Sequence, residues 1–384
     1  TAQSDIKTHA TLSNLVSLNA GSLSINANGV DQNTADTVAG SGGLVAGSAA
    51  SGTTITNSDT LASANQTTGS YSIVVSGDAT VAAAHQTNFA GSVDSTQASL
   101  AGGSGAELYH TVNSAVDANL GDGVNLYAAN LTMRALNNTT NNFAGWNVSS
   151  SSGGLASLPA GGATVNIAHS KTNASIGAGS LVHLLPTNGV SLSLLTMTAN
   201  SNIVSKQKVK IDSGGAIALA DADIATGVVA NATAVIGANT DVIVDKGDIQ
   251  IAAWGTADID NRASATTYGL AGAPSGDVKV TYVGANTVEI GQNVRLEATN
   301  GISPVDGSKP SNASIKLVAG RDLAGTVGGE LTGGPAHLNF NAVLDIFNKT
   351  AIPIPSSPNP VVRVTNLSKV EVKDSGATVR KGVN

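Results

Sequence analysis

The sequence predicts an all-β protein folded as a parallel β-solenoid, and three observations predict this fold. Apolar-polar-apolar triplets recur from end to end, among them residues 217–219, 249–251, 278–280 and 294–296. Side chains alternate across a strand, so we expect each triplet to point two residues inward and one outward. Clusters of Gly, Asn, Asp and Ser, which accept tight corners, separate the triplets. Only 12% of the 384 residues are charged and 3% aromatic, which suits a thin core of small aliphatic side chains.

Weak internal repetition suggests a coil length. Gly-Ala-Asn-Thr occurs at 237–240 and again at 284–287, and Gly-Ser-x-Ser-Ile occurs at 21–25 and again at 69–73. In both pairs the two copies are about 47 residues apart, which we interpret as two coils of roughly 23 residues each. About 16 such coils would build a rod on the order of 75 Å long. The only two methionines, Met133 and Met197, lie in identical Leu-Thr-Met triplets at 131–133 and 195–197. That wider spacing predicts matching rungs separated by coils that carry an extra excursion.

The segment boundaries follow from changes in this pattern. We expect residues 1–335 to form the solenoid body, with a loop excursion at 134–163 where runs of Asn, Thr and Ser interrupt the alternation. Residues 336–352 are apolar at spacings that suggest a short amphipathic helix or an end cap. A proline-rich connector at 353–360 then leads into a C-terminal strand extension at 361–384.

Charge and composition exclude several classes of function. A net charge of −7 argues against nucleic-acid and anionic-membrane partners, which need a basic surface. No apolar run is long enough for a transmembrane helix, so we expect no membrane insertion, and zero Cys excludes disulfides. The chain starts at Thr1 without a signal-peptide pattern, and we expect it to be a processed product or a piece of a longer precursor. Residues 1–200 hold only three basic residues, and their outward positions are mostly Ser, Thr, Asn and Ala.

No motif predicts catalysis. Asn239-Thr240-Asp241 matches one short element of pectin-cleaving β-helix hydrolases, but the other elements are missing, and a turn is the ordinary explanation. We therefore expect no catalytic residues and no enzyme activity.

No cofactor is expected, although two groups of oxygen donors could hold Ca²⁺. These are Asp221 with Asp223, and Asp258 with Asp260 and Asn261; ordinary solvated carboxylates are the alternative. The six histidines lack zinc-ligand spacing, so we assign them no metal site and expect them at the surface.

Two kinds of residue are candidates for contact with other molecules. Phe143 and Trp146 lie in the expected excursion, where they could anchor a partner or fold the loop onto the body. Asn-x-Ser/Thr sequons supply candidate glycosylation sites, if the chain is secreted. These are Asn65, Asn130, Asn137, Asn138, Asn147, Asn173, Asn231, Asn312, Asn348 and Asn366.

The runs Gly-Ser-Leu-Ser-Ile-Asn-Ala at 21–27 and Thr-Ala-Asp-Thr-Val-Ala-Gly-Ser-Gly-Gly-Leu-Val-Ala-Gly-Ser-Ala-Ala at 34–50 carry a wider resemblance. In its alternation of strand and Gly/Ala/Ser segments, the chain resembles leukotoxin-type filamentous adhesins and filamentous-haemagglutinin-like exoproteins of bacteria over residues 11–325. The resemblance implies a right-handed parallel β-helix at the cell surface, acting as a filament, fibre or adhesive shaft.

We therefore expect a non-catalytic extracellular structural or adhesive protein. It would be a subunit of a surface filament, with copies of itself as partners end to end or laterally, and host, cell-surface or matrix glycans as further partners. The segments 1–20 and 361–384 are the candidates for contacts between subunits. A carbohydrate-active β-helix enzyme and a glycosylated surface-lattice or sheath protein are the alternatives.

Overall fold

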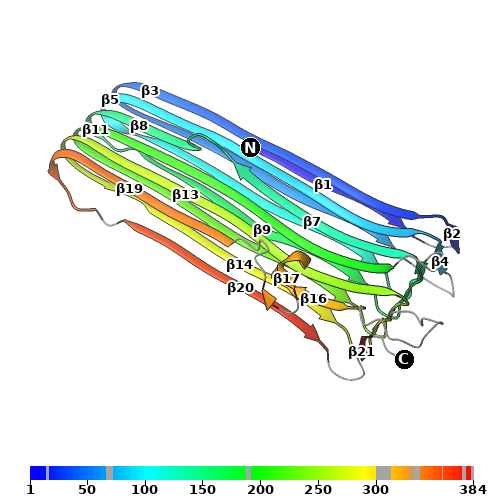
Figure 1. The fold of residues 1–384 in the computed structure, drawn as a ribbon. Coiled ribbons are helices and arrows are strands. Elements are labelled where there is room, and N and C mark those ends of the chain that lie inside the picture. The colour runs from blue at the N-terminus through cyan, green and yellow to red at the C-terminus, as the bar shows by residue number, and fades with distance from the viewer. Residues whose placement is uncertain are drawn as a thin grey trace.

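The predicted all-β parallel solenoid is confirmed. The computed structural model describes residues 1–13, 17–65, 72–186, 192–299, 313–327, 330–331, 338–356, 358–373 and 378–381. Their strands form one 12-stranded sheet, one 7-stranded sheet and a two-stranded hairpin, and every pairing outside the hairpin is parallel. The result is a slab of stacked coils whose longest dimension runs along the strands (Figure 1).

Each coil has two long legs and one short leg. A long strand such as β3 (Leu23–Ala64), β5 (Asp78–Leu120) or β11 (Ser193–Ile236) runs out to the far end of the slab, turns there and returns (Figure 1). In other coils the outward leg, the return leg or both are separate strands: β1 (Ala2–Leu12), β7 (Asn130–Asn142), β8 (Val148–Ser157), β9 (Ala160–Ile176), β13 (Gly247–Ser275), β14 (Asp277–Ile290), β16 (Ile315–Ala319), β19 (Leu338–Pro353) and β20 (Asn359–Val372). The short legs make the 7-stranded sheet: β2 (Leu18–Ala20), β4 (Ser72–Val75), β6 (Asn125–Ala128), β10 (Leu181–Leu184), β12 (Asp241–Val244), β15 (Arg295–Ala298) and β21 (Thr378–Lys381). The 3-10 helix η2 (Leu323–Gly325) and the hairpin of β17 (Thr326–Val327) and β18 (Glu330–Leu331) complete the described elements.

The coil is more than twice as long as the repeats suggested. Leu23 pairs with Ala79, and Ser193 pairs with Gly247, so one coil occupies residues 23–78 and a later one residues 193–246. The short sequence matches were fortuitous, because a triplet is only one piece of a much longer extended leg. Seven stacked short legs span about 34 Å at the usual spacing of parallel strands. The long rod of many short coils that the sequence suggested is therefore wrong.

The methionine prediction is confirmed. Met133 pairs with Met197, and Leu131 pairs with Leu195. In the short legs just before them, Ala128 pairs with Leu184. In the first of these coils, only residues 129–130 lie between the short leg and the Leu-Thr-Met triplet. In the second coil, residues 185–194 lie between them. The extra residues of this coil therefore lie between Leu184 and Leu195.

Corner residues explain why the three legs meet in the same way in each coil. The turn before the short leg holds Gly123, Gly179, Asn239 and Asn293 at φ between 54° and 68°. The amide of each of the first three donates to a carbonyl of the next coil, for example from Asn239 to Gln292 at 2.8 Å. Gly and Asn tolerate this left-handed conformation best. In the Asn-Thr-Asp element, Asn239 thus lies in a turn and Asp241 begins β12.

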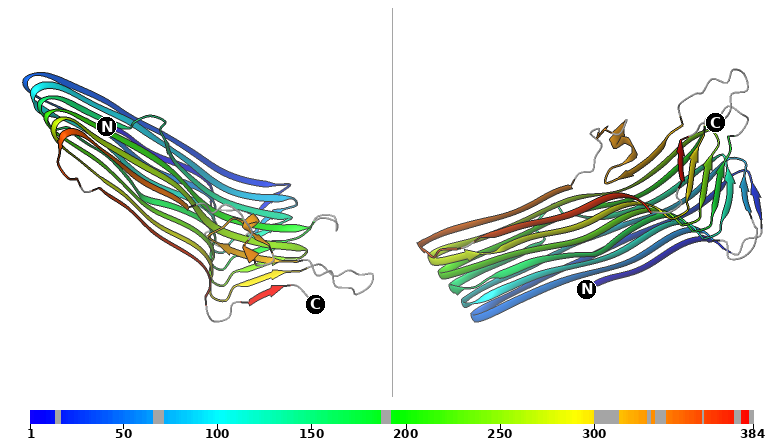
Figure 2. Two further views of the ribbon diagram at one scale, coloured as in Figure 1. Left: turned by 60° about the vertical axis from the view of Figure 1, so that its left-hand side comes forward. Right: turned by 90° about the horizontal axis from the view of Figure 1, so that it is seen from below.

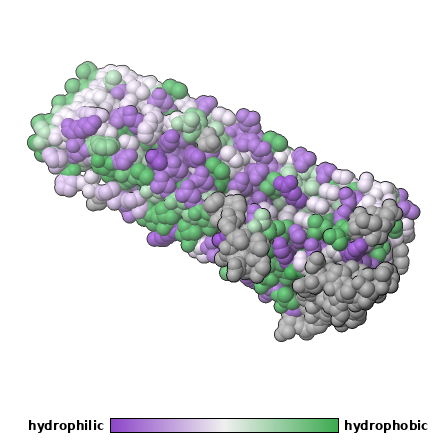
Figure 3. Space-filling model, viewed as in Figure 1, coloured by the Kyte–Doolittle hydropathy of each residue, from purple (hydrophilic) through white to green (hydrophobic). Residues whose placement is uncertain are grey.

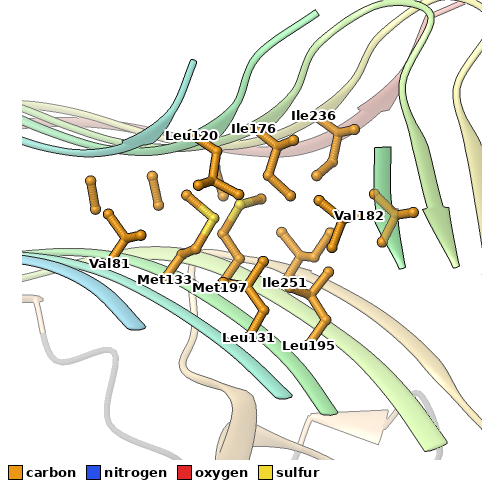
Figure 4. Close-up of a cluster of buried hydrophobic side chains, with 14 of the residues drawn as sticks. Val81, Leu120, Leu131, Met133, Ile176, Val182, Leu195, Met197, Ile236 and Ile251 are labelled. Atoms are coloured by element: carbon orange, nitrogen blue, oxygen red, sulfur yellow. The ribbon is translucent and has the colours of Figure 1, made fainter. Parts of the chain in front are cut away.

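The core consists of small inward-facing side chains. Where the three legs meet, Met133 and Met197 from the outward legs face Leu120 and Ile176 from the return legs, and Val182 of a short leg closes the cluster (Figure 4). Two further apolar clusters, one including Val148 and Ile211 and the other Ile167 and Ile203, fill the slab between its long legs. Thin, close-packed layers of this kind need few aromatics.

Buried polar side chains, some of them hydrogen-bonded to each other, separate these clusters. Ser58 donates to Ser114 at 2.8 Å, and Ser114 donates to Asn137 at 3.0 Å, all inside the slab. Asn137 and Asn141 lie on β7 and are fully buried. The predicted excursion at 134–163 is therefore wrong: strands β7, β8 and β9 occupy most of it, and only residues 143–147 and 158–159 lie outside them. The sequence misled because inward-facing Asn, Thr and Ser look like loop residues.

At the far end, one triplet is inverted. Ile217 and Leu219 are 55% and 38% exposed, whereas Ala218 is fully buried, so residues 217–219 alternate out, in, out. Ile217 pairs with Ala156 and Ala271 in the neighbouring coils. Leu44, Leu155 and Leu270 are likewise exposed, and apolar residues colour this end of the surface (Figure 3).

The C-terminal segments continue the solenoid. Residues 338–353 form β19, which pairs in parallel with β13, so the expected amphipathic helix is wrong. Leu338, Phe340, Ala342 and Leu344 alternate inward with strand periodicity. β20 pairs with β14 over its whole length, so it is a return leg of the last coil. Among the described residues, no helix is long and apolar enough to span a membrane.

Candidate functional site

The last coil leaves one edge of the solenoid unpaired. This C-terminal edge consists of β19, β20 and β21, which pair only with the preceding coil among the described strands. Val362, Val364, Val370 and Val372 of β20 are 43–47% exposed, whereas their partners Val280, Tyr282, Val288 and Ile290 are at most 1% exposed. The edge therefore presents free backbone groups beside a row of half-covered valines.

The first coil leaves the opposite edge unpaired. This N-terminal edge consists of β1, β2 and the outward leg of β3, each of which pairs on one side only in the described structure. Ile6, Ala10 and Leu12 point inward from β1 and are half-buried. Like the C-terminal edge, this edge combines open hydrogen-bonding groups with an incompletely covered core.

The two edges match along their return and short legs, and all pairings between legs are parallel. The described return and short columns hold seven legs each, but the outward column holds six, so a second copy paired on the return and short legs would leave β3 two strand spacings from β19. A single inward column runs through the return legs from one edge to the other: Leu12, Ala64, Leu120, Ile176, Ile236, Ile290 and Val372. A second copy whose return leg pairs with β20 in the same register would therefore continue this column.

A local excursion modifies the C-terminal edge. The chain leaves the outward leg after β16 and passes through η2, β17 and β18 before β19 resumes the leg. The hairpin stands out from the sheet on the C-terminal side, near the short legs (Figure 2). Most of β19 and β20 runs beyond it toward the far end.

The two aromatic candidates lie at the break between β7 and β8. Trp146 is 44% exposed, whereas Phe143 is partly covered. A Cβ on Gly145 would lie 3.2 Å from the Phe143 ring, which shows that the ring packs against this backbone. Lys208 from the next coil donates to the Ala144 carbonyl at 3.3 Å. The Phe143 ring therefore packs within the short loop, Lys208 ties that loop to the next coil, and Trp146 is the side chain presented to solvent.

The sequon asparagines have very different environments. Asn137 and Asn147 are fully buried, and Asn147 donates to the Gly91 carbonyl, so neither can accept a glycan in the folded chain. Asn348 points inward and donates to the Gly272 carbonyl at 2.7 Å. Asn231 and Asn366 are exposed, Asn65, Asn130, Asn138 and Asn173 are partly exposed, and Asn312 lies outside the described residues.

The proposed calcium ligands do not converge. Asp258 and Asp260 point outward, where Asp258 accepts from Asn339 and Asp260 accepts from Asn341, whereas Asn261 is buried and points inward. Asp221 accepts from Ser275, and Asp223 accepts from the backbone of Asp277. Burial raises the pKa of Asp223, which opposes the ionised form a cation needs. Within the described ranges, no three His, Cys, Asp or Glu side chains form a metal-binding group.

Two of the histidines expected at the surface are buried. His85 Nε2 lies 2.9 Å from Asp31 Oδ2, and its Nδ1 lies 2.9 Å from Thr60 Oγ1. This Asp-His-Thr order matches that of a nucleophile relay, but all three side chains are closed off from solvent, so a substrate cannot reach them. His110 is also buried and contacts Thr54. Only the inward parity of residues 85 and 110, on the same face as Val81 and Val112, could have revealed this placement.

No family model, curated protein or solved structure matches the chain.

Proposed function

We propose that the chain is a non-catalytic, extracellular structural or adhesive protein that forms a subunit of a surface filament through β-strand contacts. The observation that carries the proposal is the matching of the two open edges along their return and short legs. The N-terminal edge of one copy stacks on the C-terminal edge of the next, and the return and short columns continue across the junction.

The inward columns of the return leg indicate what such a junction buries. Continuing the observed pairings by one rung places Leu12 on Val372 and Ala10 on Val370. Thr8 falls on Ser368, in a column that already holds Thr60 and Thr172. These contacts would cover the half-exposed valines of β20 and let small hydroxyl side chains hydrogen-bond to each other.

The energetic gain comes from two terms. Burying the exposed half of several valine side chains contributes a few kcal/mol, at about 25 cal/mol per Å² of apolar area. Pairing also satisfies the edge N–H and C=O groups, and strand addition to an open edge is a common mode of association. The C-terminal hairpin restricts this addition near the short legs, so the return leg supplies most of the junction.

The outer surface is consistent with a shaft that meets other molecules. In residues 1–200, the outward positions are mostly uncharged Ser, Thr, Asn and Ala. Stacking along the axis leaves these faces and the far end accessible.

The test blocks one edge at a time. Val370→Asp puts a charge on the inner face of the C-terminal edge, and Ala10→Asp does so at the N-terminal edge. Thr365→Asp is the matched control, because Thr365 lies on the outer face of the same strand as Val370. Sedimentation velocity should show assembly of the wild type and of Thr365→Asp, and monomers for each edge variant.

Mixing the two edge variants sharpens the test. Each keeps one intact edge, so an equimolar mixture should form dimers and nothing longer. Circular dichroism of each variant confirms that it is folded. A wild type that stays monomeric at all concentrations, or edge variants that assemble like the wild type, would contradict the proposal.

A further inference from the structure

The outer face of the return legs contains a hollow that the edge contacts do not use. This outer groove has a volume of about 650 Å³ and crosses β1, β3, β5, β9 and β11. Lys7, Asn57, Asn113, His169, Lys171 and Asn231 are among its lining residues. It lies near the N-terminal edge, but the side chains of these six residues point away from the core.

Two local features create the hollow. In one column across the coils, Lys7 is followed by Asp59, Ala115, Lys171 and Asn231, so the methyl group of Ala115 leaves a gap between long neighbours. In the next column, the register shifts by one residue at β9, where Val112 pairs with Ile167 but Asn113 pairs with His169. A β-bulge of this kind re-aims the following side chain, here His169 at the groove.

The groove holds two of the few basic residues in this half of the protein, beside Asp5 and Asp59. Residues 1–200 contain three basic residues, and two of them, Lys7 and Lys171, line the groove. Lys171 lies 3.4 Å from Asp117 and is 60% exposed, which leaves ammonium protons free to donate. Lys7 and Lys171 are three strand spacings apart, which is about 14 Å.

A fixed row of polar side chains runs beside the column that holds these two lysines. Asn57 Nδ2 donates to Asp5 Oδ1 at 2.6 Å, and Asn113 Nδ2 donates to Asn57 Oδ1 at 2.9 Å. This chain orients the amides and lowers the pKa of Asp5, mainly through Asn57, so that its carboxylate stays an acceptor. The row offers both donors and acceptors, which is what sugar hydroxyl groups require.

We infer that the outer groove binds a carboxylated oligosaccharide. Its carboxylates contact Lys7 and Lys171, and its hydroxyls hydrogen-bond to Asn57, Asn113 and Asp59. A polynucleotide fits poorly because it offers at most one free hydroxyl group per unit to the row of Asn57 and Asn113, whereas each sugar of an oligosaccharide offers two or three. This inference rests on the adhesive role within the proposed function and gives it a ligand class. It does not require assembly, so it can fail or succeed independently of the filament.

The experiment uses the folded full chain, held as a monomer by Val370→Asp, and titrates it with tetragalacturonate by isothermal calorimetry. Lys7→Gln with Lys171→Gln should weaken binding at least tenfold, and Ala115→Leu, which fills the hollow, should weaken it similarly. Two control variants should not alter binding. Arg134→Gln removes the one basic residue of positions 1–200 that lies outside the groove. Ala285→Leu enlarges an alanine further along the column that contains Ala115. Cellotetraose, the neutral probe, should bind at least tenfold more weakly.

Three results would overturn the inference. They are no binding of tetragalacturonate by the parent protein, equal binding of cellotetraose, and equal losses in the groove variants and the controls. Binding that survives Ala115→Leu but not Lys7→Gln with Lys171→Gln would also overturn it, because simple surface charge would then be sufficient.

Discussion

His85 and Asp31 form a fully buried pair between adjacent coils, with Nε2 2.9 Å from Oδ2. In register, His85 faces Gly29 and Asp31 faces Thr87, so the imidazole crosses over a glycine to reach the carboxylate diagonally. The pair therefore depends on the coil register and on the missing side chain at Gly29.

Removing one partner should be costly. Asp31→Ala leaves the buried imidazole without its acceptor, and we expect a loss of about 3 kcal/mol in the free energy of unfolding. A double-mutant cycle with His85→Ala should give a coupling above about 2 kcal/mol. His9 and Asp59 are the matched exposed pair at 3.1 Å, and their coupling should stay below about 1 kcal/mol. Urea denaturation measures both cycles, and equal couplings would contradict the buried placement.

Gly29 should tolerate no side chain. A Cβ there would collide with His85 Nδ1 and would lie 2.9 Å from Thr60 Oγ1. Gly29→Ala should therefore lower stability by about 1–3 kcal/mol, because it forces the ring out of place. Gly153→Ala is the control, since no atom lies within 4 Å of the position that its methyl group would take. Thermal melts that show equal effects for both would argue against this packing.

His110 should make stability fall in mild acid. Burial lowers its pKa to about 4 from the ordinary 6.5, so the folded chain keeps it neutral while the unfolded chain takes up a proton. The stabilising contribution is complete above pH 6.5 and is lost as the pH falls toward 4. Between pH 7.5 and 4.5 the loss amounts to about 2–3 kcal/mol.

The measurement compares urea unfolding of the wild type and of His110→Gln at both pH values. The variant should show a drop that is smaller by that amount. A pH dependence identical in the two proteins would rule out a buried neutral His110.

The far end should tolerate polar residues at positions that look like core. Ile217→Asn and Leu219→Asn should each change stability by less than about 0.5 kcal/mol, because both side chains face solvent. Ala218→Asn, between them, should cost more than about 2 kcal/mol because it buries an amide without a partner. Chemical denaturation of the three variants shows which side chains of this triplet point inward. The reverse order of effects would contradict an inward Ala218 with outward Ile217 and Leu219.

The fold class could be predicted from the sequence because the alternation of apolar and polar residues is visible within each short stretch of strand. In a triplet such as Val278-Lys279-Val280, the sequence itself shows which side chains point inward and which points outward. The two Leu-Thr-Met triplets also pair with each other in register in the structure. The coil length could not be predicted, because Ala, Ser and Thr extend a leg without an apolar signal. The orientation of residues 217–219 was predicted wrongly because their parity reverses near the far-end turn, where Gly215 pairs with Gly154 and Gly269.

The candidate sites were less predictable than the fold. Asn147 resembles a glycan acceptor in sequence, but its side chain replaces strand hydrogen bonds to Gly91 and Lys208 inside the slab. The outer groove depends on Lys7, Asn57 and Lys171, which come together only once the register is known. These three residues are far apart along the chain, so no local pattern links them.

Electron microscopy of the purified protein tests the proposed assembly most directly. Stacking predicts continuous ribbons about 70 Å wide across the legs, with an axial repeat of about 34 Å for each copy of seven stacked short legs. Discrete particles of that size at every protein concentration, with no ribbons, would contradict a solenoid that continues from one copy to the next.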